Sequence, residues 1–538
     1  MKKTLFCACL LVIAGLLFST INIYGADKKI AKFTWLKEPD TLNPMYTGTW
    51  FSRITQQIWN CDPWVYDDTN IPVPVLLTKM PSVENGGISA DGKTMTFSLR
   101  NDITWSDKAP ITAADFVFTW EMYNSGSNTV NSTYPYDVIK SVKAVNTTTV
   151  VMKFDKPFVA WAGSLGQEIL PEHILRPIFE ADGTLDEASW NLAPEVGCGP
   201  YVFKEWESGS YAHFVKNKNY YGTTPKIDEI FLRFVPNRAA QASALQTGDA
   251  NLGTLVSYSD IPTLKAAGVN ILPVVGGYNE GWYFNFAENT HPAIKDLKVR
   301  QAIAMGFDRF SLVKDMMLGM TEPAASFWHN TPWQDPALEP WPYDIERAKK
   351  LLDEAGWTDS DNDGIRDKDG LKLIIIHGSA TSRVRQDTQA IAQQHLSKIG
   401  VQLKIQNYAP DVFYSQNSPC AKGELDICEY SGAPDFPDPN TSRFLCKSIP
   451  SSDNPGGRNM PHLCDRHLDD MFKNQSTEIS SDKRKAIMHE ISQYMTENVY
   501  WLGVWHDPDI WAYSSKLSGV NLSGPTPFYN IAEWDIVP

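Results

Sequence analysis

Residues 371–405, which read LKLIIIHGSATSRVRQDTQAIAQQHLSKIGVQLKI, decide the fold class of this chain. Residues 371–377 form a short apolar run typical of a buried strand. The apolar residues of 385–398 recur at helical spacing, Gly400 ends that helix, and 401–405 alternate as a second strand. Two strands joined by one helix over so short a stretch predict a parallel pair with a right-handed crossover.

A second unit of the same kind lies earlier in the chain. It consists of a predicted strand at 229–234, a helix at 238–247 and a strand at 270–274. Because such units occur on both sides of residue 280, we expect two α/β lobes. Lobes of this class bind ligands where the loops at the strand ends face a crevice.

Length and charge restrict the class of function. The chain has 538 residues, more than one hydrophobic core accommodates, so two or more domains are expected. Its formal charge is −15, and such an acidic surface repels nucleic acid and anionic membranes, so we expect no nucleic-acid partner. The sequence lacks Gly-x-Ser-x-Gly, His-Glu-x-x-His and phosphate-loop motifs, which argues against an enzyme and leaves an exported hydrolase as the remote alternative.

The N-terminus has the pattern of a secretory signal peptide. A basic pair precedes an apolar run over 5–18 that is too short to span a bilayer, and cleavage after Gly25 fits the small-residue rule. We therefore predict a signal peptide at 1–25 and a periplasmic or extracellular protein. Cys7 and Cys9 lie inside the apolar run, so we expect a freely soluble mature protein or one that keeps its N-terminal anchor.

Six cysteines follow the signal segment, an even number that permits disulfides in an oxidising compartment. Proximity in sequence favours a Cys446–Cys464 pair, and a Cys420–Cys428 pair as the next candidate. Cys198 stands between two glycines and is predicted to be a buried thiol. Zinc is disfavoured because no two cysteines have C-x-x-C spacing.

An acidic segment lies just before residues 371–405. Asp359, Asp361 and Asp363 have the spacing that opens a calcium loop, and Asp367 stands at the ninth position. A complete loop has a bidentate Glu at the twelfth position, where this chain has Gly370. We favour a solvated acidic turn over a calcium site and expect no cofactor.

Three further stretches carry a family resemblance: DGKTMTFSLR at 91–100, ITWSD at 103–107 and PITAADF at 110–116. They resemble the signature of the extracellular solute-binding proteins that include the oligopeptide- and dipeptide-binding proteins of ABC importers. Later segments match in the family's order, and the resemblance covers essentially the whole mature chain. These segments are LPEHIL at 170–175, GCGPY at 197–201, VRQAI at 299–303 and DFPDP at 435–439.

The resemblance implies an α/β fold of periplasmic-binding-protein architecture, with mixed sheets flanked by helices in two lobes and an additional domain inserted in lobe one. Mapped onto this chain, lobe one takes 26–70, 190–275 and 505–538, the inserted domain takes 71–189, and lobe two takes 276–504. It also implies a monomer that captures short peptides between the lobes by hinge closure and delivers them to a membrane permease. The alternative within the family is an oligosaccharide ligand, of cellobiose or of xylo- or manno-oligosaccharide type.

The resemblance also implies a site. Asp435 matches the family aspartate that pairs with the α-amino group of a peptide, an attraction that is strong in a poorly solvated cleft. Its alternative role is to build a turn in a Pro- and Asp-rich loop. Thr47, Gly48 and Trp50 match a segment that contacts ligand largely through its backbone.

Aromatic residues are further candidates for the cleft wall. Trp282 and Tyr283 are neighbours on a predicted strand, so they face opposite sides and only one of them is expected in the cleft. Tyr430 is a candidate on the same grounds, although core packing is the usual role of such rings. Relatives often carry Trp just ahead of the binding aspartate, whereas this chain has Gly432 and Ala433.

Overall fold

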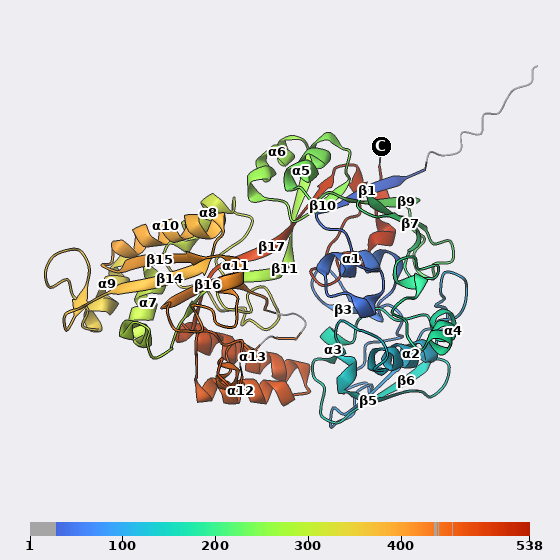
Figure 1. The fold of residues 1–538 in the computed structure, drawn as a ribbon, viewed down its shortest axis with the longest axis horizontal. Coiled ribbons are helices and arrows are strands. Elements are labelled where there is room, and N and C mark those ends of the chain that lie inside the picture. Colours follow the sequence, from blue (N-terminus) through green and yellow to red (C-terminus); the bar gives the residue numbers. More distant parts are fainter. Residues whose placement is uncertain (1–27, 435–437, 440, 455, 538) are drawn as a thin grey trace, which may run out of the picture.

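The computed structural model describes residues 28–434, 438–439, 441–454 and 456–537. Two bodies lie side by side, and two long strands run from one to the other (Figure 1). These strands are β11 (Val269–Phe284) and β17 (Trp501–Ser514), which pair antiparallel along most of their length. The predicted signal peptide at 1–25 lies outside the described residues, and no helix within them is long and apolar enough to cross a bilayer.

The first lobe is built on a five-stranded part of the main sheet. In β9, half-buried and buried side chains alternate, because one face packs on the core. β1 lies parallel to β9 and β10, whereas β8 is antiparallel to β7 and β9. Its elements are β1 (Ile30–Trp35), α1 (Trp50–Trp59), β7 (Tyr201–Glu207), β8 (Tyr211–Lys216), β9 (Glu229–Phe234), α5 (Arg238–Thr247), β10 (Leu252–Thr254) and α6 (Ile261–Ala266).

The chain between the first pieces of this lobe forms a smaller sheet of its own, with the order β4-β6-β5 and antiparallel pairing throughout. Its apolar side chains join the same buried cluster as those of β1, so the two parts share one core. The elements here are β4 (Thr94–Ser98), α2 (Ala113–Asn124), β5 (Ile139–Ala144), β6 (Thr149–Phe154), α3 (Trp161–Ser164) and α4 (Glu172–Asp182).

The second lobe contains the parallel pair predicted from residues 371–405. β14 lies parallel to both β15 and β16, and β16 is antiparallel to β11. Its elements are α7 (Leu297–Gly306), α8 (Arg309–Met316), α9 (Ile345–Glu354), β14 (Ile374–Ala380), α10 (Arg383–Ser397), β15 (Gln402–Tyr408), α11 (Pro410–Phe413), β16 (Ile427–Gly432), α12 (Arg466–Thr477) and α13 (Ser481–Glu497).

Short elements complete the fold. They are two-stranded pairs and 3-10 turns: β2 (Trp64–Tyr66) with β3 (Pro72–Pro74), β12 (Asp367–Lys368) with β13 (Leu371–Lys372), β18 (Leu517–Ser518) with β19 (Asp535–Ile536), η1 (Pro44–Tyr46), η2 (Tyr136–Val138), η3 (Ser189–Asn191), η4 (Tyr258–Asp260), η5 (Pro292–Lys295), η6 (Cys446–Ser448) and η7 (Ile531–Glu533). After β17 the chain returns to the first lobe, where Phe528 stacks on Phe33 of β1 at 6.0 Å between ring centroids.

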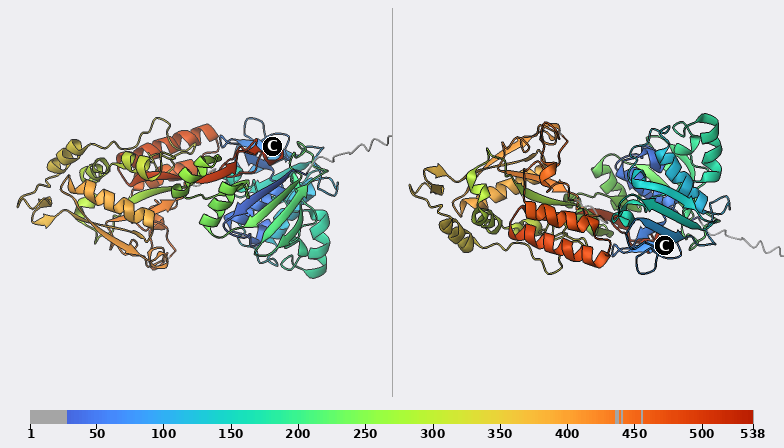
Figure 2. Two further views of the ribbon diagram at one scale, coloured as in Figure 1. Left: turned by 90° about the horizontal axis from the view of Figure 1, so that it is seen from above. Right: turned by 90° about the horizontal axis from the view of Figure 1, so that it is seen from below.

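The hinge is the middle of β11 and β17. The sheet order β15-β14-β16-β11-β17-β10-β1-β9-β8-β7 places these two strands between the lobes, and the views from above and below show them joining the halves (Figure 2). Their pairing is interrupted between Val274 and Tyr278, where the sequence has Gly276 and Gly277. An interrupted ladder with two glycines bends more easily than a regular one, so this is the natural pivot.

One strand assignment from the sequence was wrong. Residues 270–274 were expected to be the parallel strand that completes the first unit. Instead β10 (Leu252–Thr254) is parallel to β1, and 270–274 belong to β11, which is antiparallel to β17. Three residues of β10 are too few to show an alternating pattern, whereas the apolar run 270–274 of the hinge strand resembles a complete strand.

Three disulfides join the described cysteines. Cys420–Cys428 and Cys446–Cys464 are present as predicted. Cys198 is not a free thiol, because it bonds to Cys61 across 137 residues. Sequence proximity favours local pairs and could not indicate this one, which forms because the end of α1 packs on the GCGPY segment, with Trp59 against Gly197 and Gly199.

Candidate functional site

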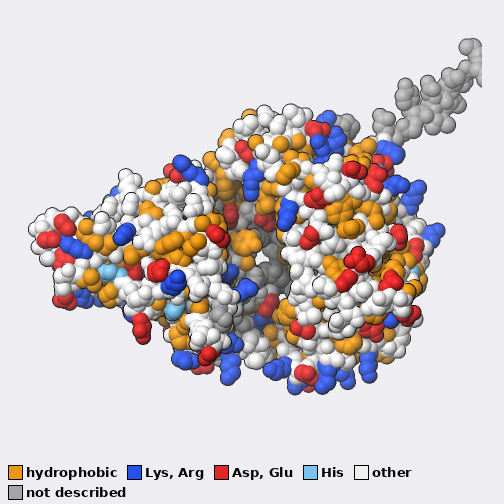
Figure 3. All heavy atoms as spheres, viewed as in Figure 1, with side chains coloured by type: hydrophobic (Ala, Val, Ile, Leu, Met, Phe, Trp, Pro, Cys, Tyr) orange, Lys and Arg blue, Asp and Glu red, His pale blue; other side chains and the backbone are white. Residues whose placement is uncertain are grey.

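The interlobe space is the candidate binding site. The space-filling view shows a hollow between the two halves, with carboxylate and apolar side chains in its wall (Figure 3). The hinge strands border this space, the segment before α1 lies on the first lobe, and the end of β16 lies on the second.

On the first lobe, Asp40 organises the predicted binding segment. Its carboxylate accepts hydrogen bonds from the hydroxyls of Thr47 at 2.7 Å, Ser52 at 2.6 Å and Thr49 at 3.3 Å. Burial acts to raise the pKa of Asp40, but these donors outweigh it and hold the pKa below its usual value. The Thr47 side chain therefore serves the turn, and only the backbone around it remains for a ligand.

Gly48 and Trp50 continue this segment toward the hinge. Gly48 is exposed, and a side chain there would approach the amide of Asn131 at 2.9 Å. Trp50 is half-buried and packs its ring edge-on against Trp511 of β17, with 6.1 Å between the centroids. The segment thus combines an exposed stretch of backbone with an aromatic ring that rests on the hinge strand.

On the second lobe, Tyr283 of β11 and Tyr430 of β16 stack face to face, with centroids 4.0 Å apart. Both rings are buried, and burial raises the pKa of both phenols. Gly432 is required beside them, because a Cβ there would lie 2.4 Å from the Phe327 ring and 2.5 Å from the Tyr283 hydroxyl. A larger residue at this position would displace one of these two rings.

Trp282 points to the other side of β11, as strand alternation requires. It is fully buried and stacks on Phe307 at 4.8 Å, with His377 at 4.6 Å. This placement makes it a core residue of the second lobe. The remaining candidate, Asp435, lies outside the described residues.

A buried ion pair behind the hinge was not found from the sequence. Arg385 of α10 forms two parallel hydrogen bonds to Glu280 of β11, each 2.9 Å long. Ser431 of β16 donates to the same carboxylate at 2.6 Å. The network connects the second-lobe end of β11 to α10. Its residues are far apart in the sequence and form no recognisable motif.

Two carboxylates of β17 were also missed. Burial, followed by the charges of Glu280 and Asp509, raises the pKa of Asp507 to about 6. Burial alone raises the pKa of Asp509 to about 6. The Tyr258 hydroxyl donates to Asp507 at 3.4 Å, whereas the Asp509 side chain has no hydrogen bond or ion pair among the described residues. Two carboxyl groups with raised pKa values thus stand two residues apart on β17.

The sequence comparison identifies the family. Residues 72–449 match the model of the bacterial extracellular solute-binding proteins, family 5. This chain belongs to that family. The match covers well over half of the chain, including the β4–β6 sheet, the hinge strand β11 and β16.

The known proteins that resemble this solute-binding protein align with it over most of both chains. The oligopeptide-binding protein AppA of Bacillus subtilis is 28% identical over 476 residues, which cover 87% of this chain and 84% of AppA. The structure of AppA in complex with a nonapeptide superposes with a TM-score of 0.66 at 23% identity, covering 95% of this chain and all of the other. NikZ of Campylobacter jejuni in complex with Ni(L-His) superposes with a TM-score of 0.70 at 23% identity, covering 94% and 99%. The two structures establish the two-lobed fold.

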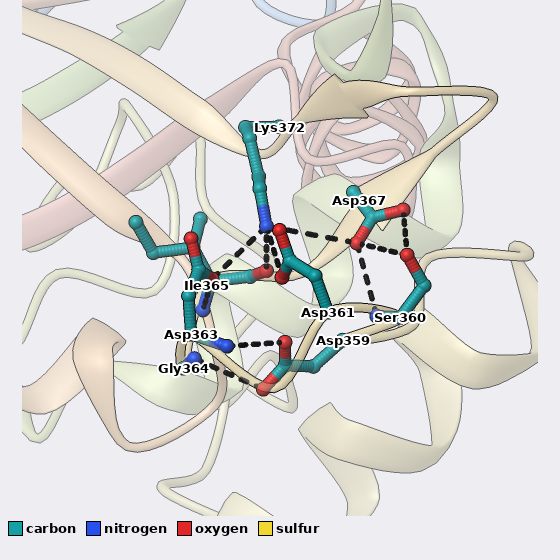
Figure 4. Close-up of polar contacts among 8 residues, drawn as sticks. All are labelled: Asp359, Ser360, Asp361, Asp363, Gly364, Ile365, Asp367 and Lys372. Atoms are coloured by element: carbon teal, nitrogen blue, oxygen red, sulfur yellow. Dashed lines mark hydrogen bonds and ion pairs between the residues drawn. The ribbon is translucent and has the colours of Figure 1, made fainter.

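The acidic loop of this solute-binding protein lies away from the interlobe space. Asp359, Asp361 and Asp363 place carboxylate oxygens within 4.8 Å of one another. The Lys372 ammonium reaches into the same group, at 2.5 Å from Asp361 and 3.0 Å from Asp363 (Figure 4). It also approaches Asp367 at 3.7 Å.

The carboxylates of this loop also accept hydrogen bonds that shape the turn. Asp359 accepts from the backbone N–H of Asp363 and of Gly364, at 3.1 and 3.0 Å. Asp367 accepts from the N–H and hydroxyl of Ser360. A lysine thus places a positive charge among the carboxylates of this loop.

Proposed function

We propose that this protein is the solute-binding component of an ABC importer and captures short peptides between its lobes. The observation that carries the proposal is the similarity to the oligopeptide-binding protein AppA, which extends over 87% of the chain. The Di/tripeptide-binding protein 2 of Pseudomonas aeruginosa is a further relative, 25% identical over 475 residues. The protein acts outside the cytoplasm, as a monomer that docks on a membrane permease.

The geometry of the first lobe supports a peptide. An extended peptide offers backbone N–H and C=O groups along its length, and the exposed backbone at Gly48 offers matching groups. Main-chain recognition of this kind gives affinity without demanding a particular side chain. Trp50 borders the same stretch and supplies an apolar wall for one side chain of the ligand.

The second lobe would recognise the peptide N-terminus. Asp435 follows β16 by three residues and corresponds to the family aspartate for the α-amino group. In a closed cleft, an ammonium paired with this carboxylate exchanges water for a charge-assisted hydrogen bond. A peptide that binds both the backbone at Gly48 and the carboxylate of Asp435 bridges the two lobes. Such a peptide binds the closed form more tightly than the open form, so it shifts the equilibrium toward closure.

Thermal-shift measurements on mature protein test the ligand class. We expect a pool of di- to pentapeptides to raise the melting temperature, since a ligand in hundredfold excess over its Kd adds about 2.7 kcal/mol to the free energy of unfolding. The shift should disappear in Asp435→Asn and persist in Asp411→Asn, a control on exposed α11. A shift with oligosaccharides alone, equal in both variants, would replace the peptide with a sugar and leave Asp435 a turn residue.

A further inference from the structure

The lobes touch at a second place besides the hinge. Below the hinge strands, α13 of the second lobe faces α3 of the first (Figure 1). Arg484 of α13 donates from Nη1 to the backbone carbonyl of Val159, just before α3, at 3.3 Å. Beside this contact, Ile479 lies over Gly92, where an added Cβ would meet its methyl group at 2.7 Å.

Arg484 holds two groups of its own lobe at the same time. Its Nε donates to Gln475 of α12 at 3.1 Å, and its Nη2 donates to Asp438 at 2.5 Å. The guanidinium also lies 5.1 Å from the ring centroid of Trp333. The side chain is only 7% exposed, so these contacts fix its position while one N–H is aimed at the opposite lobe.

The junction around Arg484 is an interface between surfaces, not a continuous core. A cavity of about 350 Å³ lies within it, lined from the first lobe by residues such as Phe158 and Trp161 and from the second by Trp333 and Ile479. Packed interiors leave few voids of this size. Surfaces that meet at a few points around a cavity can separate without breaking either core.

We infer that Arg484 is a closure latch: its guanidinium joins the Val159 carbonyl of the first lobe to Asp438 and Gln475 of the second, and so holds the lobes together opposite the hinge. The inference rests on the proposed hinge closure but not on the identity of the ligand. When the lobes separate, the hydrogen bond from Arg484 to the Val159 carbonyl breaks, and the freed N–H of the guanidinium is hydrated. The contacts of Arg484 within the second lobe persist. The Arg484 side chain therefore keeps its position when the lobes open and close, so little conformational entropy is lost when the contact forms.

The latch is also close in sequence to the proposed ligand residue. Asp438 stands three residues after Asp435, and the guanidinium that contacts the first lobe also binds Asp438. Arg484 is thus a positioning residue, and its substitution should change the conformational equilibrium and not only stability.

Amide hydrogen exchange and small-angle X-ray scattering on ligand-free protein test the latch. In Arg484→Met, we expect protection at 89–92 and 157–163 to fall about tenfold or more, because a hydrogen bond from a charged donor is lost, together with a larger radius of gyration. Arg484→Lys should recover part of the protection, since an ammonium keeps the charge but not the planar fork. Arg466→Met on neighbouring α12, an exposed arginine without an ion pair among the described residues, should match the native protein.

A second variant covers the case in which Arg484→Met unfolds. Ile479→Ser weakens the contact over Gly92 from the half-buried link between α12 and α13 and should open the same junction. Unchanged protection and an unchanged envelope in a folded Arg484 or Ile479 variant would overturn the latch. Because both measurements are made without ligand, failure of peptides to bind would refute the proposed ligand and leave this result standing.

Discussion

Asp509 on the hinge strand provides a test at the scale of one residue. Its pKa is raised to about 6 in the folded protein by burial, so the folded state holds a proton more firmly than the unfolded chain. The contribution of Asp509 to stability therefore falls as the pH rises from about 4 to about 6. We expect Asp509→Asn to increase the free energy of unfolding by about 1–3 kcal/mol at pH 7, and to have little effect at pH 4.

Chemical denaturation at both pH values measures this effect, with Asp249→Asn as the control. The pKa of Asp249 is lowered, first by its hydrogen bonds with Arg233 and Lys32. The stabilisation by the ionised Asp249 is present above the usual pKa of an aspartate and is lost as the pH falls. Asp249→Asn should therefore destabilise the protein at pH 7. An Asp509→Asn variant that is less stable than native protein at pH 7 would contradict the assigned burial.

Lys372 is the test residue of the acidic loop. Its hydrogen bond with Asp361 raises its pKa above the usual 10.5, so the stabilisation is present at neutral pH and is lost only in strong base. We expect Lys372→Met to lower the melting temperature at pH 7 and to let calcium raise it, because the carboxylates are left without a counter-charge. Native protein and a Lys349→Met control should not respond to calcium; a calcium shift in native protein would show a cation site that Lys372 does not fill.

These residues show what sequence reasoning reaches at this scale. The grouping of Asp359, Asp361 and Asp363 in one loop was predictable, because the three aspartates stand at alternate positions. Lys372 was not, because the β12–β13 pair folds it back over the turn and no motif includes it. In the same way, Glu280 and Arg385 are 105 residues apart, and only the tertiary fold brings them together.

At the scale of elements, predictions succeeded where local signals suffice. One such signal is the reciprocal capping box between Thr112 and Asp115, which starts α2. The strand and helix at Glu229–Phe234 and Arg238–Thr247 have the predicted bounds. The 16-residue β11 was not foreseen, since its central glycines look like a chain break although the strand continues through them.

The Cys61–Cys198 disulfide is the element-scale prediction. It ties the end of α1 to the segment before β7 and closes a loop of 137 residues. Replacing both cysteines with alanine should lower the free energy of unfolding by about 3–5 kcal/mol, chiefly because the unfolded chain gains freedom. Replacing Cys420 and Cys428, whose loop is 8 residues, should cost less; equal losses in denaturant titrations would contradict this assignment.

At the scale of the whole molecule, two lobes share one sheet through β11 and β17 and meet again at Arg484. This arrangement gives the interlobe space a pivot on one side and a separable contact on the other. The two-lobed fold was predictable from recurring α/β units and from the family signature. The cleft contacts were not, because they depend on how distant segments approach across the hinge.

Native mass spectrometry of the mature protein tests peptide capture most directly. The protein is mixed with an equimolar pool of short peptides with free N-termini, the same peptides acetylated, and cello- and xylo-oligosaccharides. The account predicts one-to-one adducts with free peptides and none with acetylated peptides or sugars, because the α-amino charge is needed. Adducts with sugars alone, or equal binding of free and acetylated peptides, would contradict it.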